Sequence, residues 1–290
     1  SISVDNKTGL LNISRMTPEV VGEIGDSGVW TIFVYMCGTD LETNYGMGTG
    51  DIAEMCAASD SDNVRFVVET GGTYEWQNSA VESESIQRFV VQHGAIEAVD
   101  EQPRTSMGSS LTLSDFLLWG VENYASEHMG VVLWDHGGGS VTGICFDERE
   151  NYDSLSLAEL DEALYTYYGQ RGRRFDFIGF DACLMGTVET ANILATYADY
   201  MYGSEETEPG SGWDYTAIGD FLASNPDADG LMLGKVVCDS FLAACKAQND
   251  DTLTTLSVID LGNIDTLLNA FNIFASGMYN VSSNTAVRAE

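Results

Sequence analysis

Mostly apolar runs alternate with amphipathic segments along the chain. Four runs of seven to nine residues have the character of strands that are covered on both faces of a parallel sheet. With two less marked strands, the expected set is 29–37, 63–70, 130–136, 175–181, 200–204 and 254–260. Helical spacing is found at 44–58, 113–125, 157–168, 184–195, 215–222, 231–247 and 264–278. This alternation predicts a doubly wound, mostly parallel, six-stranded sheet with helices on both faces.

The remaining segments are expected to lie outside this six-stranded sheet. Residues 84–93 alternate and predict a hairpin with 95–100, and 142–147 predicts a short strand before a charged, turn-like insertion at 148–156. Residues 1–28 are polar and dotted with glycine, which indicates an extended leader. One domain is therefore expected over 29–290, and its helical pattern near the end suggests that a further C-terminal region follows.

The net charge of the chain limits the kinds of molecule that it can bind. With 45 Asp and Glu against 12 Lys and Arg, the formal net charge is −33. Such a surface repels phosphate backbones, so nucleic acid is excluded as a partner, whereas cationic peptides and divalent cations are attracted. Solubility alone is the alternative explanation. No apolar run approaches the roughly 18 residues of a membrane span, and a removed secretion signal is compatible with the start at Ser1.

Motifs exclude several chemistries. Six cysteines without a CxxC pair argue against both a disulfide scaffold and a structural zinc. The chain has no GxSxG elbow, P-loop, GxGxxG after the first strand or HExxH, which argues against serine hydrolases, nucleotide binding and zinc hydrolases. The candidate catalytic residues that remain after these exclusions require no cofactor. The many carboxylates are compatible with calcium, although no DxDxDG loop is present.

Two predicted strands stop at a residue that can do chemistry. VVLWDHGGGS (131–140) ends in His136 and three glycines, and FIGFDACLM (177–185) reaches Cys183 at the expected start of a helix. Parallel strands end at one edge of a sheet, so the imidazole and the thiol should meet there. A neighbouring base activates a thiol. Alternation turns Asp135 to the other face, and no third orienting residue is evident, so we expect a Cys–His dyad.

These strings resemble the clostripain family of cysteine peptidases, within the caspase-like group that includes gingipains and legumains. The resemblance is carried by WTIFVYM (30–36) with DLE (40–42), by WDHGGG (134–139) and by FDACLM (180–185). It implies a caspase-like three-layer α/β/α sandwich. It also implies Cys183 as nucleophile, His136 as its partner, and Gly137 as a contributor to the oxyanion hole, where the main-chain N–H of Cys183 would also point.

The resemblance further implies specificity for basic residues. In clostripain-like enzymes the aspartate that matches Asp181 lines the primary specificity pocket and selects Arg or Lys. Asp181 lies two residues before Cys183 and thus projects on the same side of the strand. A carboxylate pairs bidentately with Arg, which favours Arg over Lys. The loop 204–208, which contains Ser204 and Glu206, is a candidate pocket wall, or alternatively a solvated acidic loop.

The expected function is a secreted or envelope-associated cysteine endopeptidase that acts on peptides or proteins with basic residues. Self-activation by a cut after Arg149, on the charged insertion, is a further expectation, with the cluster Arg171, Arg173 and Arg174 as the rival position. Two alternatives stay open. One is an inactive or non-proteolytic binding protein on the same fold, and the other is a cysteine hydrolase of non-peptide amides.

Overall fold

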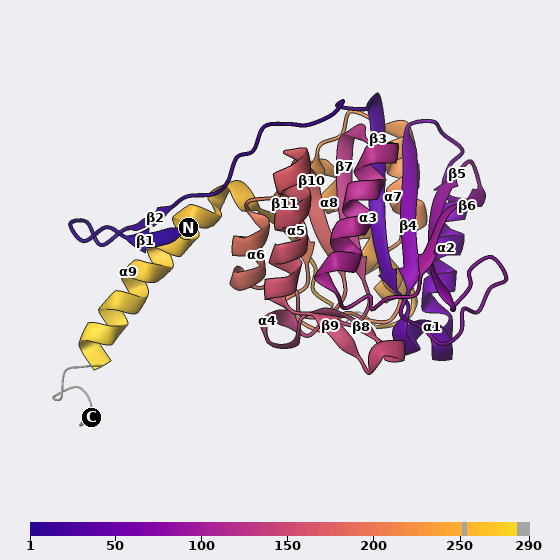
Figure 1. Ribbon diagram of the computed structural model, residues 1–290. Coiled ribbons are helices and arrows are strands. Elements are labelled where there is room, and N and C mark those ends of the chain that lie inside the picture. Colours follow the sequence, from indigo (N-terminus) through magenta and orange to yellow (C-terminus); the bar gives the residue numbers. More distant parts are fainter. Residues whose placement is uncertain (251–253, 283–290) are drawn as a thin grey trace.

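A single mixed sheet organises the protein. The computed structural model describes residues 1–250 and 254–282, and in these ranges its main sheet has eight strands in the order β12-β11-β10-β7-β3-β4-β5-β6 (Figure 1). The strands are β3 (Asp26–Cys37), β4 (Val64–Gly71), β5 (Ser85–Gln92), β6 (Ala95–Pro103), β7 (Ser126–Trp134), β10 (Phe175–Asp181), β11 (Ala198–Gly203) and β12 (Ser257–Asp260). The five strands from β11 to β4 are parallel, and β12, β5 and β6 are antiparallel to their neighbours.

The predicted count of six strands is therefore wrong, and the predicted hairpin accounts for the difference. β5 pairs with β4, with Val68 opposite Phe89, so the β5–β6 hairpin extends the sheet instead of standing apart from it. The apolar positions of β5 explain this pairing, because Ile86, Phe89 and Val91 are buried. An alternating hairpin with one apolar face needs a surface to cover it, and the edge of the sheet offers one.

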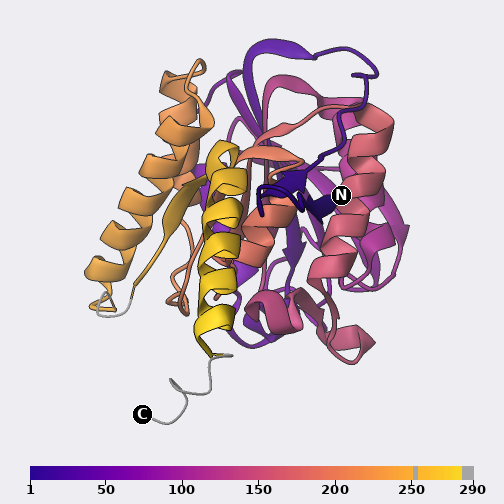
Figure 2. The same ribbon diagram turned by 90° about the vertical axis from the view of Figure 1, so that its left-hand side faces the viewer.

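Helices cover both faces of the sheet. Residues of odd number in β3 and β7, such as Phe33 and Val131, pack under α3 (Ser110–Tyr124) and α5 (Leu157–Arg171). Residues of even number, such as Ile32 and Val132, pack under α2 (Met47–Ala57), α7 (Tyr215–Ser224) and α8 (Gly230–Ala247). Viewed toward the β12 edge, α8 and α5 lie on opposite sides (Figure 2). This period-two division gives the three layers that the sequence predicts.

Short elements connect the layers near the carboxyl ends of the central strands. The helix expected at 44–58 is α2, which begins at Met47, and a further short helix precedes it and ends at Gly46, whose φ is 64°. The charged insertion contains a 3-10 turn and a small two-stranded ribbon. These elements are α1 (Thr39–Tyr45), α4 (Gly139–Thr142), β8 (Ile144–Asp147), η1 (Glu148–Glu150), β9 (Asp153–Leu155) and α6 (Val188–Leu194).

The N-terminal segment is more ordered than an extended leader. β1 (Ile2–Val4) and β2 (Leu11–Ile13) form a hairpin beside α9 (Ile264–Ser282), and β3 already begins at Asp26 (Figure 1). Arg15 ties this segment to α9 through an ion pair of 2.6 Å with Asp265. Residues 251–253 and 283–290 of the expected domain lie outside the described residues. Within the described ranges, no helix combines the length and the apolar character that crossing a membrane requires.

Candidate active site

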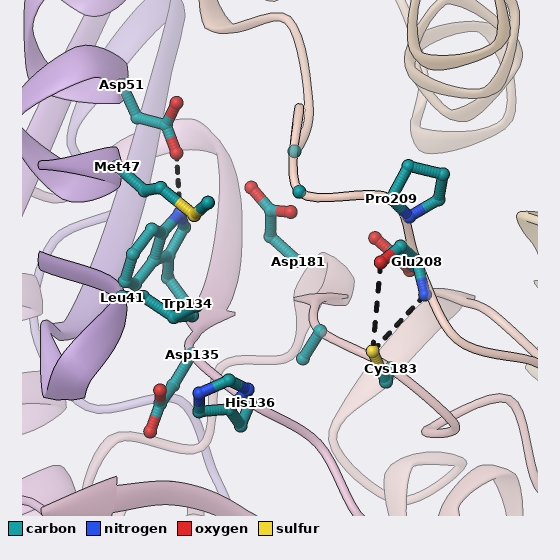
Figure 3. Close-up of a pocket in the computed structure, with 13 residues that line it drawn as sticks. Leu41, Met47, Asp51, Trp134, Asp135, His136, Asp181, Cys183, Glu208 and Pro209 are labelled. Carbon is teal, nitrogen blue, oxygen red and sulfur yellow. Dashed lines mark hydrogen bonds between the residues drawn. The ribbon is translucent and has the colours of Figure 1, made fainter. Parts of the chain in front are cut away.

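The register of two central strands brings His136 and Cys183 together. β7 and β10 are parallel neighbours, with Trp134 opposite Asp181. His136 and Cys183 each follow this matched pair by two residues, so both leave the sheet at the same height. Both line one cavity of about 290 Å³ (Figure 3). The structure thus places the predicted imidazole and thiol at a single site.

Gly137 lies directly against the main chain of Cys183. A Cβ atom at Gly137 would stand 2.0 Å from the carbonyl oxygen of Cys183 and 3.1 Å from its nitrogen. A methyl group cannot occupy that space without displacing backbone, so the position requires glycine. The close approach brings together the two main-chain segments that the sequence predicts as sides of an oxyanion hole.

Cys183 does not open a helix, contrary to the sequence-based expectation. Leu184 has a φ of 65°, which interrupts the chain after the nucleophile, and α6 begins only at Val188, capped by Thr187. The helix dipole therefore offers no support to the thiolate at Cys183. The sulfur instead accepts a hydrogen bond from the main-chain N–H of Glu208 at 3.2 Å, and its thiol donates to the carbonyl oxygen of the same residue at 3.9 Å (Figure 3).

The imidazole has an acidic partner that sequence reasoning missed. His136 Nε2 lies 2.9 Å from Asp40 Oδ1, at the start of α1. Asp135, by contrast, is buried and accepts a hydrogen bond from the main-chain N–H of Phe146, on the insertion that follows His136. The sequence signals for Asp40 are its place just after the carboxyl end of β3, the strand next to β7, and its presence in the DLE string (40–42) that carries part of the resemblance.

The cavity beside the nucleophile is acidic. Asp181 is buried, and its carboxylate accepts hydrogen bonds from the Tyr215 hydroxyl at 2.9 Å and the Trp213 N–H at 3.3 Å. Gly212, with a φ of 62°, leaves room above this carboxylate, because a Cβ there would lie 3.5 Å from both of its oxygens. Figure 3 shows Asp181 pointing into the space between Trp134 and the segment around Pro209.

Asp51, Asp135 and Glu208 line the same cavity, and of these Glu208 belongs to the loop 204–208 that the sequence predicts as a pocket wall. Asp51 accepts a hydrogen bond of 2.6 Å from the indole N–H of Trp134. Both carboxyl oxygens of Glu208 are buried. Buried polar atoms are rarely left unsatisfied. The Trp213 side chain acts on these oxygens as a donor and opposes the rise of the Glu208 pKa that burial causes.

Burial changes the protonation of these acids. Desolvation raises the pKa of Asp181 to about 7, although the hydrogen bonds from Tyr215 and Trp213 oppose it. Desolvation and the nearby Asp181 raise the pKa of Asp51 and of Glu208 well above the ordinary range. In the empty cavity the carboxyl groups therefore tend to hold protons. A cation placed among them would favour their charged forms.

Two residues of the predicted pocket-wall loop 204–208, Ser204 and Glu206, do not line the cavity. The Ser204 hydroxyl is buried and bonded to Thr255 Oγ1 and to the Glu206 carbonyl, so it braces the loop. Glu206 is exposed and contributes its carbonyl oxygen, which accepts from the Leu184 N–H at 3.0 Å. The pocket-lining acid of this loop is Glu208, which is two residues further along.

Arg149, the predicted processing position, is held in η1 against the body of the protein. Its guanidinium forms an ion pair with Glu84 at 2.9 Å, donates to the Ser83 carbonyl at 2.6 Å, and lies over the Tyr74 ring. The rival arginines are also bound, as the following contacts show. Arg171 pairs with Glu122, Arg173 donates to the Ser126 carbonyl, and Arg174 pairs with Asp199.

Metal binding has no structural support in the part of the chain that is described. No group of three or more His, Cys, Asp or Glu side chains is arranged there to hold an ion. Calcium therefore stays a prediction from composition.

Comparison with known proteins places the chain in a family. The model described as "Clostripain family" (Peptidase_C11) matches residues 34–289. The chain belongs to the clostripain family. No curated protein sequence matches it. Family membership makes it a cysteine peptidase and agrees with the resemblance that the sequence motifs carry.

Solved structures of C11 proteases share the fold. A secreted protease from Bacteroides thetaiotaomicron, iotapain, gives a TM-score of 0.65 at 17% identity over 82% of this chain and 68% of its own. The B. thetaiotaomicron secreted protease in complex with an irreversible peptide inhibitor gives 0.63 at 18%, over 82% and 67%. An inactive zymogen from Parabacteroides distasonis gives 0.62 at 21%, over 86% and 65%. The chain thus spans about two thirds of these relatives' length, and the caspase-like architecture is confirmed.

Substitution of Gly137 tests whether its backbone must lie against the nucleophile. Gly137→Ala should lower kcat on a peptide substrate by about 100-fold, because the methyl group displaces the Cys183 main chain and misplaces oxyanion donors. Gly169→Ala in α5 is the matched control, since a Cβ there meets nothing within 4 Å. Steady-state kinetics with thermal midpoints would measure both. An unchanged kcat in Gly137→Ala contradicts the assignment.

Proposed function

We propose that this clostripain-family peptidase is an endopeptidase that cleaves after Arg, and less well after Lys, through Cys183 and His136. The observation that supports this specificity most directly is the acidic cavity beside Cys183. Its lining includes the carboxyl residues Asp51, Asp135, Asp181 and Glu208, and among the described residues no lysine or arginine lines it. A long cationic side chain fits such a cavity, whereas an acidic one is repelled.

The proposed reaction uses the residues in their observed places. Cys183 Sγ attacks the scissile carbonyl carbon, and its proton passes to the imidazole of His136. The developing oxyanion is stabilised by main-chain N–H groups where Gly137 meets Cys183. His136 then protonates the departing amine and later takes a proton from the water that hydrolyses the thioester. The sulfur and the imidazole now bond to other partners, and such apo contacts commonly rearrange when substrate binds.

The proposed preference for Arg over Lys depends on how many hydrogen-bond acceptors the cavity has and how far apart they lie. A guanidinium presents five N–H donors in a plane, and an ammonium presents three donors at one point. The lining of the cavity includes the carboxyl groups of Asp181 and Glu208 on different elements. A planar, forked cation can reach both groups at once.

Exchange of the pocket carboxylate tests specificity. Asp181→Asn should reduce the preference for Arg over citrulline before the cut by about 10–100-fold, because one charge-assisted hydrogen bond is lost. Citrulline is a suitable comparison because it matches Arg in shape but is neutral. The measurement is kcat/KM on paired fluorogenic peptides. Cys183→Ala should abolish cleavage of both, and an Arg preference that survives in Asp181→Asn would remove Asp181 from the pocket.

The raised pKa of Asp181 predicts a pH dependence of selectivity. The carboxyl is protonated below pH 7 and ionised above it, since burial raises its pKa to about 7. The Arg-to-citrulline ratio of kcat/KM should therefore rise with pH through 7, by about tenfold per unit on the acid side for one titrating group. Titration of the nucleophile and base cancels in the ratio. A ratio that is flat between pH 5.5 and 8.5 contradicts this origin of specificity.

Self-processing after Arg149 is part of the proposal. Arg149 and Glu150 lie on the insertion that follows the catalytic histidine, and a basic residue there matches the proposed specificity. The guanidinium must first leave Glu84 and the Ser83 carbonyl to enter an active site. The contacts of Arg149 would therefore slow the cut until the insertion opens.

The cut can be located by mutation. Arg149→Gln should leave the chain intact during incubation, whereas Glu84→Gln should speed the appearance of a fragment that begins at Glu150, because it removes one end of an ion pair. Gel analysis with N-terminal sequencing follows both variants. Fragments that begin after Arg171, Arg173 or Arg174 would transfer the assignment to the rival cluster.

Secretion or attachment to the envelope completes the proposal. It is supported by the description of one structural relative as a secreted protease. Proteins or peptides with accessible basic residues are the proposed substrates.

A further inference from the structure

We propose that Asp40 is a positioning residue of the active site, which holds the His136 imidazole through Nε2 and leaves Nδ1 to exchange protons with Cys183. The inference rests on the proposed catalytic roles of His136 and Cys183 and adds a third group to them. Its basis is the contact of 2.9 Å between Asp40 Oδ1 and His136 Nε2.

The contact selects one form of the ring. A carboxylate only accepts hydrogen bonds, so Nε2 carries the proton when it faces Asp40. In the neutral ring, Nδ1 is then the basic nitrogen. When the thiol ionises, its proton moves from Sγ to Nδ1, the ring becomes a cation, and Asp40 stays ionised beside it. The carboxylate thus fixes the tautomer and stabilises the imidazolium, without itself taking the proton.

The backbone before Asp40 is held in a strained conformation. Thr39 has a φ of 49°, in the left-handed region that a β-branched residue rarely adopts. It is fully buried, its hydroxyl donates to the Phe146 carbonyl at 2.6 Å, and its own carbonyl accepts from Thr73 Oγ1 at 3.0 Å. Strain of this kind persists where surrounding contacts impose it, and it is common at functional sites.

The same contacts link Asp40 to the histidine loop. Phe146, which accepts from Thr39, also donates its N–H to the Asp135 carboxylate, and Asp135 directly precedes His136. Asp135 is thus occupied with the insertion and does not orient the imidazole. Asp40 fills that place from the neighbouring strand, since β3 pairs with β7 up to Met36 opposite Trp134.

Removal of the carboxylate tests the role. Asp40→Ala should lower kcat on an Arg peptide by about 100-fold, in the range of acid–base contributions, while KM stays within about twofold, because Asp40 lies outside the cavity wall. Asp40→Glu should recover part of the loss, since it returns a carboxylate. Asp60→Asn is the matched control. It breaks an aspartate–histidine pair with His93, away from the cavity, and should leave kcat unchanged.

A second measurement separates this inference from the proposed function. Iodoacetamide alkylates the Cys183 thiolate whatever peptide the enzyme accepts, and peptide mapping by mass spectrometry identifies the modified cysteine. Asp40→Ala should slow this alkylation about tenfold, because a displaced imidazole no longer assists ionisation of the thiol.

Each outcome has a distinct meaning. If the native protein cleaves Arg peptides and Asp40→Ala keeps its kcat and its alkylation rate, the inference is wrong and the proposed function stands. If the native protein cleaves no Arg peptide, the proposed function fails, and the alkylation rates alone decide the role of Asp40. If the thermal midpoint shows that Asp40→Ala does not fold, Asp40→Ser, which also removes the carboxylate, gives the same comparison.

Discussion

The register between β7 and β10 is the constraint on which the site depends. Phe177 stands opposite Gly130, and a Cβ on that glycine would lie 2.0 Å from the phenyl ring. The ring also stacks on Tyr202 of the next strand, with centroids 4.3 Å apart. A large residue opposite a glycine fits in one alignment only, and a slip by one position would turn every side chain to the wrong face. This register pairs Trp134 with Asp181, and it therefore places His136 and Cys183, two residues further along the chain in each case, at the same site.

Burial of acids at this edge connects specificity with protonation. Four carboxyl residues, Asp51, Asp135, Asp181 and Glu208, line one cavity in a chain of net charge −33, and desolvation raises the pKa of each of them. Without a cation, the favourable state is a protonated, largely neutral pocket. Entry of a guanidinium favours the ionised carboxylates, so binding of a basic side chain is coupled to release of protons. The same burial that strengthens the pairing also makes it sensitive to pH.

The sequence predicts the parts of the site that depend on strand ends. Long apolar runs mark β3, β7 and β10, and the residues that follow them, His136, Cys183 and Asp181, all reach the cavity. The extra strands and the missed acids depend on tertiary contacts. The alternating pattern of the β5–β6 hairpin predicts its two strands, but it does not show whether the hairpin pairs with the main sheet. The choice of Glu208 instead of Glu206 depends on how the loop lies over Cys183, which no local pattern encodes.

The expected helix at Cys183 failed for a similar reason. Residues 184–195 have helical spacing, but the Leu184 and Gly186 N–H groups donate to the Glu206 and Ser204 carbonyls of the neighbouring loop. Those bonds satisfy amides that would otherwise begin a helix, so α6 starts later, at Val188. The same loop contacts the nucleophile, because the Glu208 N–H donates a hydrogen bond to the sulfur. One segment thereby sets both the polarity around the nucleophile and the acidic wall of the pocket, so a change in its path would alter reactivity and specificity together.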